Sequence, residues 1–484
     1  MTQAAPTTST AVTHASCTFV HSCRARTSLA LLASDLVAWG TSAALAIWLA
    51  ARFGVMVDGG DMLLGAVGLA LAPLAYAGFG LYPAAGVSRV DEFRRLTFGS
   101  SGVWLVLVAA VGLGHGFAEI APLVATWFLA LAAVPIARGV LRHLVMRQPW
   151  FGVPVVVLGA GQAAALVVRR LQRFPANGYR PLALFDDDPA LIGTRVHGIP
   201  VVGRLDAAAA YAAQGVRHAI VAMPSLKAAC LAEVVRRTAR PFPNVILLPE
   251  FTGFASVGVT PRSLGGLVGL HVRRELLRRR SLIMKRAIDL ALLVPLGLVA
   301  APIVLLAALA VRAVSPGSPF YFQEREGQGG RSFRMWKLRT MHHGADALLQ
   351  RHLAENPDAA AEWAAKFKLA GDPRILPGIG QLLRKTSLDE LPQLWNILRG
   401  EMSFVGPRPF PAYHLDAFDD GFRALRREVL PGLTGLWQVT ARADADLALQ
   451  EELDTIYISN WSVWMDVYLL ACTPWSVLRG GGAY

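Results

Sequence analysis

Two adjacent carboxylates, Asp389 and Glu390, stand in the polar stretch "RKTSLDELPQLWNIL". A carboxylate can act as a nucleophile and split one hard transfer into two easier steps. The start of a helix at "LPQLWNIL" would add a partial positive charge beside the pair. The same spacing fits a capping box, in which Ser387 and Glu390 only satisfy the backbone at the helix start. Spacing alone leaves the catalytic and the capping interpretation open.

Basic residues in the neighbouring polar motifs would suit an anionic substrate. Arginine can hold phosphate oxygens with two parallel hydrogen bonds, and cations offset the charge of a diphosphate. Arg408 lies in "GPRP", between two prolines that restrict its backbone, and this suits a fixed phosphate clamp. The candidate cations are Lys337, Arg339, Arg384, Lys385 and Arg408.

The composition places much of the chain in lipid. Of its 484 residues 54% are hydrophobic and only 17% are charged, against about 25% charged in typical soluble domains. The formal net charge of +13 fits basic loops that face the anionic cytoplasmic leaflet. A nucleic-acid partner is disfavoured, because the basic residues flank apolar runs and no interleaved aromatic patch stands out.

Four apolar segments near the N-terminus are each close to the length of a spanning helix. They cover residues 27–51, 62–83, 101–118 and 120–139. Arginines before the first segment, between the second and third, and after the fourth place those ends in the cytosol. We expect a four-helix transmembrane bundle over residues 27–147, preceded by a disordered stretch over residues 1–26. Asp35 is either a buried polar contact between helices or a wet position near the interface.

Residues 152–260 change to short β-branched runs that alternate with helical stretches. "PVVVLGAG", "LALFDDD", "HAIVAMPS" and "NVILLPEF" are typical of buried parallel strands, so we expect a cytosolic Rossmann-like α/β domain. Its first turn, Gly159 to Ala164, is close to a dinucleotide fingerprint, and acids follow at Asp186 to Asp188. With no catalytic partner nearby, we favour glycines that only make the tight turn over a bound nucleotide or coenzyme.

An apolar run over residues 287–311 is long enough to span a bilayer, yet basic residues flank it on both sides. Both flanks carry the signal for the cytosolic side, which a single crossing would violate. Pro302 removes a backbone donor in mid-helix and clashes with the preceding turn, so it kinks the helix. We predict a re-entrant helix that dips into one leaflet and returns, broken at Pro302. An ordinary spanning helix is the alternative.

The motifs after residue 318 resemble one family closely. "PFYFQEREGQGGRSFRMWKLRTM", "GDPRILPGIGQLLRKTSLDELPQLWNILRGEMSFVGPRP" and "LPGLTGLWQVTARADAD" resemble the bacterial sugar transferases, the monotopic polyprenyl-phosphate phosphoglycosyl transferases. "LAENPDAAAEWAAKFKLAGDPRI" and the terminal "GGAY" are most similar to the branch of undecaprenyl-phosphate galactose phosphotransferases. The order of domains is also shared, so the resemblance covers nearly the whole chain. It implies a C-terminal α/β catalytic domain over residues 273–484.

The resemblance also implies a reaction. Such enzymes move a sugar-1-phosphate from a UDP-sugar to undecaprenyl phosphate and release UMP, through a covalent phospho-sugar enzyme. By the family's Asp-Glu dyad, Asp389 would be the nucleophile. Glu390 would be its partner, as a base or as a ligand of a nearby Mg²⁺ ion. Where family members commonly carry Ser-Pro at the helix break, this chain has Ala301-Pro302, so another group must satisfy the freed carbonyl.

Two further motifs carry candidate residues with a structural alternative. Gln438 and Arg442 would lie near the uridine or the phosphate, unless their segment is only a turn built on glycines. Glu324 and Arg325 in "FQERE" would help to hold phosphate or orient Lys337, unless they form a surface pair.

These observations predict an enzyme of the bacterial inner membrane that starts surface-polysaccharide synthesis, with its catalytic domain on the cytosolic face. Its substrates would be undecaprenyl phosphate among the membrane lipids and a UDP-sugar, with galactose first and glucose as the nearest alternative. A membrane-bound nucleotide-sugar dehydratase is a more distant alternative, which would need NAD and a Tyr-x-x-x-Lys pair that is not found after the fingerprint. A homodimer would give the bundle and the extra domain a role that the chemistry alone does not require.

Overall fold

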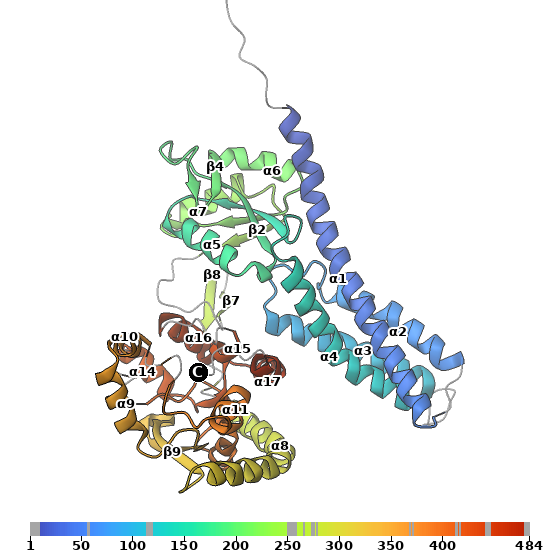
Figure 1. Cartoon of the computed structure of the whole chain (residues 1–484). Coiled ribbons are helices and arrows are strands. Elements are labelled where there is room, and N and C mark those ends of the chain that lie inside the picture. The colour runs from blue at the N-terminus through green and yellow to red at the C-terminus, as the bar shows by residue number, and fades with distance from the viewer. Residues whose placement is uncertain are drawn as a thin grey trace, which may run out of the picture. The chain divides into compact units, whose positions relative to one another are not determined.

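The protein, seen in a computed structural model, forms two compact units, Met1–Thr252 and Gly253–Tyr484 (Figure 1). The structure describes residues 10–55, 59–112, 120–248, 259–264, 267–272, 276, 279–366, 369, 372–411, 415, 418–440 and 447–478.

Four helices make the first part of the N-terminal unit. They are α1 (Thr10–Arg52), α2 (Gly59–Gly78), α3 (Arg89–Gly112) and α4 (Ile120–Val145). In the described residues α1, α3 and α4 are long and apolar enough to cross a membrane, and α2 contributes a shorter apolar stretch, Met62–Gly78. The four apolar segments are therefore four helices. The expected disorder of residues 1–26 is wrong from Thr10 onward, because extending an existing helix avoids the cost of a new nucleus.

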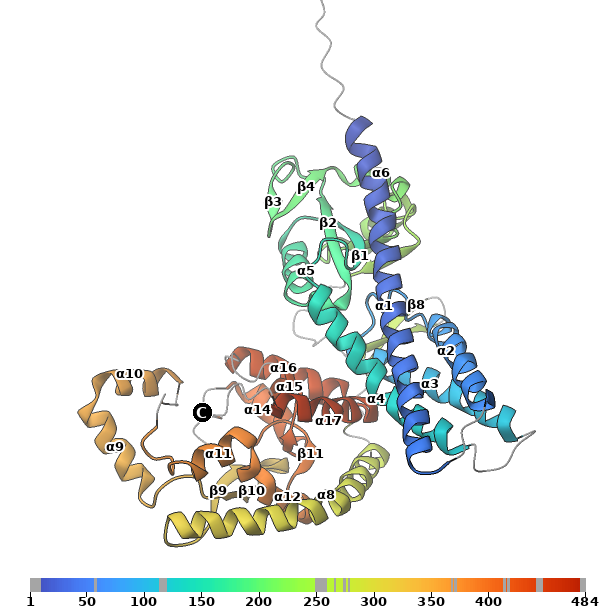
Figure 2. The ribbon, with the colours of Figure 1, turned by 45° about the vertical axis from the view of Figure 1, so that its right-hand side comes forward.

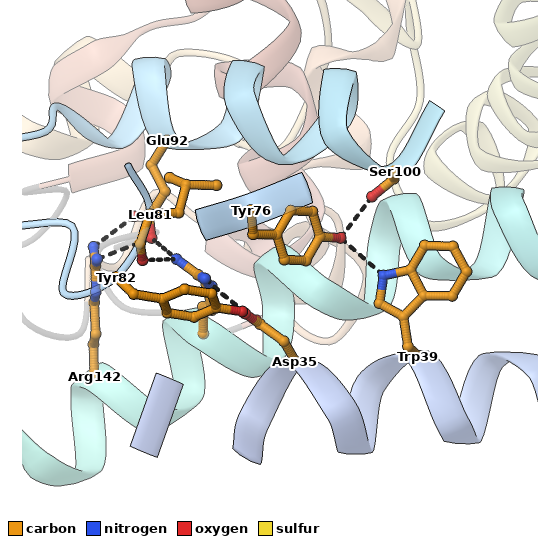
Figure 3. Close-up of polar contacts among 9 residues, drawn as sticks. Asp35, Trp39, Tyr76, Leu81, Tyr82, Glu92, Ser100 and Arg142 are labelled. Atoms are coloured by element: carbon orange, nitrogen blue, oxygen red, sulfur yellow. Dashed lines mark hydrogen bonds and ion pairs between the residues drawn. The ribbon is translucent and has the colours of Figure 1, made fainter. Parts of the chain in front are cut away.

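Buried ion pairs join three helices of the bundle (Figure 3). Arg138 of α4 donates to both carboxylate oxygens of Asp35 in α1, at 2.8 and 2.6 Å, and to Glu92 of α3 at 2.8 Å. Arg142, one turn further on, lies 2.6 Å from Glu92, and the Tyr82 hydroxyl donates to Asp35 at 2.5 Å. The four charged side chains are at most 8% exposed, and two charges of each sign balance. Asp35 is thus a buried interhelical contact.

The ion pairs correct one expectation from the sequence. The arginines that mark the cytosolic end of the fourth apolar segment include Arg138 and Arg142, yet both belong to α4 and are buried. Charge counting cannot reveal this, because a buried arginine is stable only with carboxylate partners that come from other helices.

A mainly parallel sheet follows the bundle. Its strands are β1 (Val153–Leu158), β2 (Tyr179–Phe185), β3 (Arg195–Val196), β4 (Ile199–Gly203), β5 (His218–Val221) and β6 (Asn244–Leu247), in the order β3-β4-β2-β1-β5-β6. Its helices are α5 (Gln162–Arg173), α6 (Ala209–Ala213) and α7 (Ala228–Arg237), with short η2 (Pro175–Asn177) and η3 (Leu205–Ala208). The β3–β4 pair is antiparallel and the other pairs are parallel. The four expected strands are β1, β2, β5 and β6.

The bundle and the sheet are joined within this unit. Thr27 of α1 accepts a hydrogen bond from the Gly152 amide at 3.0 Å, just before β1. The Gly86 amide, between α2 and α3, donates to the carbonyl of Asn177 at 2.9 Å. A side chain at Gly86 would collide with the Tyr179 ring. This close approach requires glycine and fixes the α/β domain on the bundle.

The C-terminal unit is built from short elements around one long helix. Its strands are β7 (Val259–Leu264), β8 (Leu267–Val272), β9 (Phe320–Glu326), β10 (Ser332–Leu338), β11 (Ser403–Val405) and β12 (Gly432–Thr434), which pair two by two. Its α-helices are α8 (Arg279–Val314), α9 (Ala345–Glu355), α10 (Pro357–Lys366), α11 (Ile379–Thr386), α12 (Leu394–Arg399), α14 (Asp420–Arg427), α15 (Leu436–Thr440), α16 (Leu447–Asn460) and α17 (Val463–Leu478). Two short 3₁₀ helices are η5 (Gln328–Gly330) and η6 (Leu388–Gln393).

The long helix α8 holds Pro295 and Pro302 and runs as two arms joined by a bend (Figure 2). Its first arm packs on β11 and α12, and its second arm packs Ala307 and Val311 against Leu338 and Leu383 of the same unit. In the most apolar stretch of α8, only 11% of the residues are buried. Proline is the usual cause of a sharp helix bend, so the bend fits the predicted break.

We predict that the bundle depends on Arg138. Arg138→Gln leaves Asp35 buried without its cation, which should cost about 3–5 kcal/mol and lower the unfolding temperature of the detergent-solubilised protein. Arg94→Gln is the matched control, because Arg94 pairs with Asp91 at 2.9 Å on the surface and should contribute less than about 1 kcal/mol. Equal shifts for the two variants would contradict the prediction.

Candidate active site

Asp389 and Glu390 occupy the first turn of η6, which runs directly into α12. Ser387 precedes them in left-handed backbone with φ 57°, and its side chain makes no capping hydrogen bond. The capping-box interpretation is therefore wrong. The helical segment begins at the two carboxylates and not at "LPQLWNIL", so its partial positive charge lies directly at the dyad.

Two cations hold the carboxylate of Glu390. Lys337 of β10 donates to Oε1 at 2.8 Å, and Arg408 donates to the same oxygen at 3.0 Å. Burial alone would raise the pKa of Glu390, but Arg408 and Lys337 outweigh it and hold that pKa far below its ordinary value. Glu390 is therefore an anion at neutral pH, and it keeps both cations beside Asp389.

Asp389 is the freer of the two carboxylates. It is 9% exposed, and Lys337 Nζ lies 3.9 Å from its Oδ2, beyond a hydrogen bond. Burial raises the pKa of Asp389, with Lys337 acting against this shift and Glu390 adding to it. Environments that push two carboxyl pKa values apart assign them different tasks. Asp389 is the more basic oxygen donor, and Glu390 organises the cations.

The dyad suits a Mg²⁺ ion only together with a substrate. Mg²⁺ is commonly held by one or two carboxylates plus phosphate oxygens and water. Among the described residues no group of three or more His, Cys, Asp or Glu side chains could hold a metal ion. Asp389 and Glu390 therefore offer a donor set for an ion that completes its coordination on substrate phosphates.

Local packing explains how the two cations reach Glu390. Asn396 of α12 accepts from the Trp336 amide at 3.1 Å and donates to the Arg334 carbonyl at 2.7 Å, which holds the strand of Lys337. Behind Arg408, β11 and β12 approach so closely that a side chain at Gly432 would collide with the Gly406 backbone. Glycine is thus required at position 432, where β12 packs against the start of the "GPRP" segment.

The first turns of α8 also hold the segment that leads to Arg408. Lys285 donates to the Val405 carbonyl at 2.8 Å and to Asp466 of α17 at 2.6 Å, and Tyr457 donates to that carbonyl at 3.0 Å. One turn on, Asp289 accepts from the Phe404 amide at 3.1 Å. Lys285 is 6% exposed, so it is a structural cation of the unit.

One more predicted cation joins the dyad. Arg384 of α11 is placed by a hydrogen bond from its Nε to Thr340 at 3.0 Å. Burial lowers the pKa of Arg384, against the attraction of Asp389. Lys385, the next residue, is exposed.

Three residues that were predicted to contact substrate have structural partners here, and their contacts with substrate stay predictions. Arg339 donates to the carbonyls of Ser315 and Pro316 at 2.7 and 3.0 Å, so it fixes the turn after α8. Gln438 donates to the Leu433 carbonyl at 3.1 Å, as the turn interpretation requires. Glu324 pairs with Arg334 across the β9–β10 ladder, on the face opposite to Lys337, so it cannot orient that lysine.

The two remaining candidates have different outcomes. Arg325 lies opposite Phe333 in the ladder and shares the sheet face of Lys337, and its Nη2 donates to Gln323 Oε1 at 2.6 Å. Arg442 lies outside the described residues, so its predicted role stays a prediction.

The sequence reasoning missed the residues that position the site. Asn396, Asp289 and Asp466 each interrupt an apolar run, and each is at most 3% exposed. A polar residue within an apolar run is a usable signal, because its burial requires a specific partner.

The chain is similar to a known family of proteins. Bacterial sugar transferases match residues 280–480. The undecaprenyl-phosphate galactose phosphotransferase of Salmonella typhimurium is 32% identical over 366 residues, 74% of this chain and 75% of its own. The chain belongs to the bacterial sugar transferase family. The UDP-galactose-lipid carrier transferase of Erwinia amylovora is also 32% identical, with 74% and 75% coverage. The UDP-glucose:undecaprenyl-phosphate glucose-1-phosphate transferase of Xanthomonas campestris is 29% identical, with 75% of each chain covered.

A second match, to CoA-binding domains, covers residues 78–249 of this sugar transferase. The glycine-rich turn does not fit a phosphate group there. Asp186 already accepts the Ala160 amide of this turn at 2.7 Å and the Asp188 amide at 3.0 Å. A phosphate would need such an amide and would be repelled by the carboxylate.

We predict that the acidic limb of the transferase rate reports Asp389. A reacting Asp389 must be ionised, so the rate should fall as pH drops through its raised pKa, above the ordinary value of about 3.9. Lys337→Gln removes a cation that lowers this pKa, so the limb should move to higher pH. Arg399→Gln, which removes a surface pair with Glu401, is the control. A limb unmoved by Lys337→Gln would refute the assignment.

Proposed function

We propose that this sugar transferase moves a hexose-1-phosphate from a UDP-hexose to undecaprenyl phosphate at the cytosolic face of the inner membrane. The observation that carries the proposal is the unequal dyad: an anionic Glu390 holds Lys337 and Arg408 beside a more basic Asp389. A nucleophile flanked by cations suits the attack of an anion on a diphosphate.

In the first step an Asp389 oxygen attacks the phosphorus that carries the sugar. The bond from that phosphorus to the UMP oxygen breaks, UMP leaves, and the sugar phosphate remains on the aspartate. Lys337, Arg384 and Arg408 offset the charge of the diphosphate and of the leaving UMP. A Mg²⁺ ion held by the dyad and the phosphates would stabilise the leaving oxygen.

In the second step a phosphate oxygen of undecaprenyl phosphate attacks the same phosphorus. The bond to Asp389 breaks, the carboxylate is restored, and an undecaprenyl diphosphate sugar leaves. Glu390 stays ionised throughout, because its two cations keep its proton affinity low. It acts as the anchor of those cations, and this argues against a role as general base.

Galactose is the sugar that we propose first. The two relatives that are 32% identical carry galactose in their names, and the relative named for glucose is 29% identical. One hydroxyl configuration separates the two sugars, so glucose remains the second candidate.

The proposed site at the lipid face requires that α8 re-enters the membrane. At about 1.5 Å per residue a straight helix of this length would extend about 54 Å. Both arms instead pack on the same unit, and the apolar side chains between them are exposed, with Leu298 at 74% and Leu306 at 67%. A bent helix with both ends on one side of the bilayer satisfies these contacts and buries the apolar residues in lipid.

We predict that Asp389 is required for UMP release. Detergent-solubilised protein given UDP-galactose and undecaprenyl phosphate should release UMP only with Mg²⁺, and Asp389→Asn should lower the rate at least about 1,000-fold. Asp420→Asn, a fully exposed aspartate on α14, is the control. Release that survives Asp389→Asn would remove the assigned nucleophile, and faster turnover of UDP-glucose would change the sugar.

We predict that both flanks of α8 face the cytosol. In a variant without native cysteines, Arg280→Cys and Ser318→Cys should react with a membrane-impermeant maleimide only when the cytosolic side is accessible. Asp61→Cys, in the first turn of α2, should react from the opposite side. Labelling of positions 280 and 318 from different sides would exclude re-entry.

A further inference from the structure

A buried arginine, Arg426 of α14, lies behind the proposed phosphate clamp. Its Nη2 donates to the main-chain carbonyl of Arg408, and its Nη1 donates to Asp454 of α16. Its guanidinium lies 4.5 Å from the centre of the Phe410 ring. Arg426 therefore contacts both sides of the turn that carries Arg408, through the carbonyl of Arg408 itself and through the ring two residues on.

Asp454 holds Arg426 in this place. The aspartate is 1% exposed, and burial raises its pKa to about 6 against the attraction of Arg426. Breaking a buried ion pair is costly, so the guanidinium has one stable position. An ion pair that served only the core would need no contact with the active-site backbone. Arg426 nevertheless donates from Nη2 to the Arg408 carbonyl.

The clamp needs this support because its own side chain is long and 35% exposed. Prolines on both sides restrict the backbone of Arg408, but they remove two amide donors that could have anchored the turn. A charged hydrogen bond to the carbonyl supplies an anchor of a different kind. A small displacement of a positioned group can cost a large factor in rate.

We propose that Arg426, held by Asp454, is a positioning residue that fixes the main chain of Arg408 so that its guanidinium reaches Glu390 and the diphosphate. The proposal rests on the proposed function, in which Arg408 binds phosphate. It assigns Arg426 no contact with substrate.

A double-mutant cycle in the full-length enzyme tests the proposal. Arg426→Lys keeps the charge and a bond to Asp454 but cannot also reach the Arg408 carbonyl. It should weaken the affinity for UDP and lower kcat/KM for UMP release about 10- to 100-fold. In an Arg408→Lys background the same change should cost less than about twofold, because the positioned group has already been altered.

Arg427→Lys is the matched control, since this neighbour pairs with Glu326 and not with Arg408. It should leave UDP affinity and kcat/KM within about twofold of wild type. Asp454→Asn repeats the double-mutant cycle with the acidic partner of Arg426. It replaces Arg426→Lys if that variant does not fold.

Equal losses in the two Arg408 backgrounds would overturn the proposal, because they would show a purely structural effect. The UDP-affinity cycle is read without turnover, so it separates this inference from the proposed reaction. A wild-type enzyme that binds UDP but releases no UMP would remove the proposed function and leave the coupling measurable.

Discussion

The site depends on keeping two neighbouring carboxylates in different electrostatic surroundings. Glu390 accepts from both Lys337 and Arg408, while Asp389 is buried beside them without a direct bond to either. If both carboxylates were equally paired, neither would be a good nucleophile. If neither were paired, their mutual repulsion and burial would favour protonation. The asymmetry gives one ionised anchor and one basic oxygen, and the surrounding elements serve to maintain it.

The long helix α8 is part of that arrangement and not only an anchor. At its first arm Lys285 and Asp289 hold β11, which leads directly into the segment of Arg408. At its second arm Ala307 and Val311 share a core cluster with Leu338, next to Lys337, and with Leu388, next to Asp389. The helix thus touches the supports of both cations and of the nucleophile.

Local rules in the sequence were enough for most of the elements, whereas the catalytic interpretation of the dyad came from the family resemblance. A bend in α8 is expected from the prolines inside it, and the strands of the α/β domain follow from β-branched runs. Long-range contacts set the limit. Catalysis and capping share the spacing Ser387 to Glu390, and they differ only in where Glu390 points. Lys337, 53 residues earlier in the chain, decides this. Glu324 cannot orient Lys337 for a similar reason, because the register of the two strands places the side chains on opposite faces.

Long-range contacts also determine how the bundle and the α/β domain join in the N-terminal unit. The helix α1 has 43 residues, about 65 Å at 1.5 Å per residue, which is twice the roughly 30 Å of a hydrocarbon core. Its extra turns carry Thr27, which bonds the start of the α/β domain. Arg138 also donates to the Leu81 carbonyl, at the base of the loop that meets this domain. Buried ion pairs within the bundle and glycine contacts at the junction therefore hold bundle and sheet together in one compact unit. Because Asp186 accepts the Ala160 amide of the glycine-rich turn, that unit is better suited to support than to coenzyme binding.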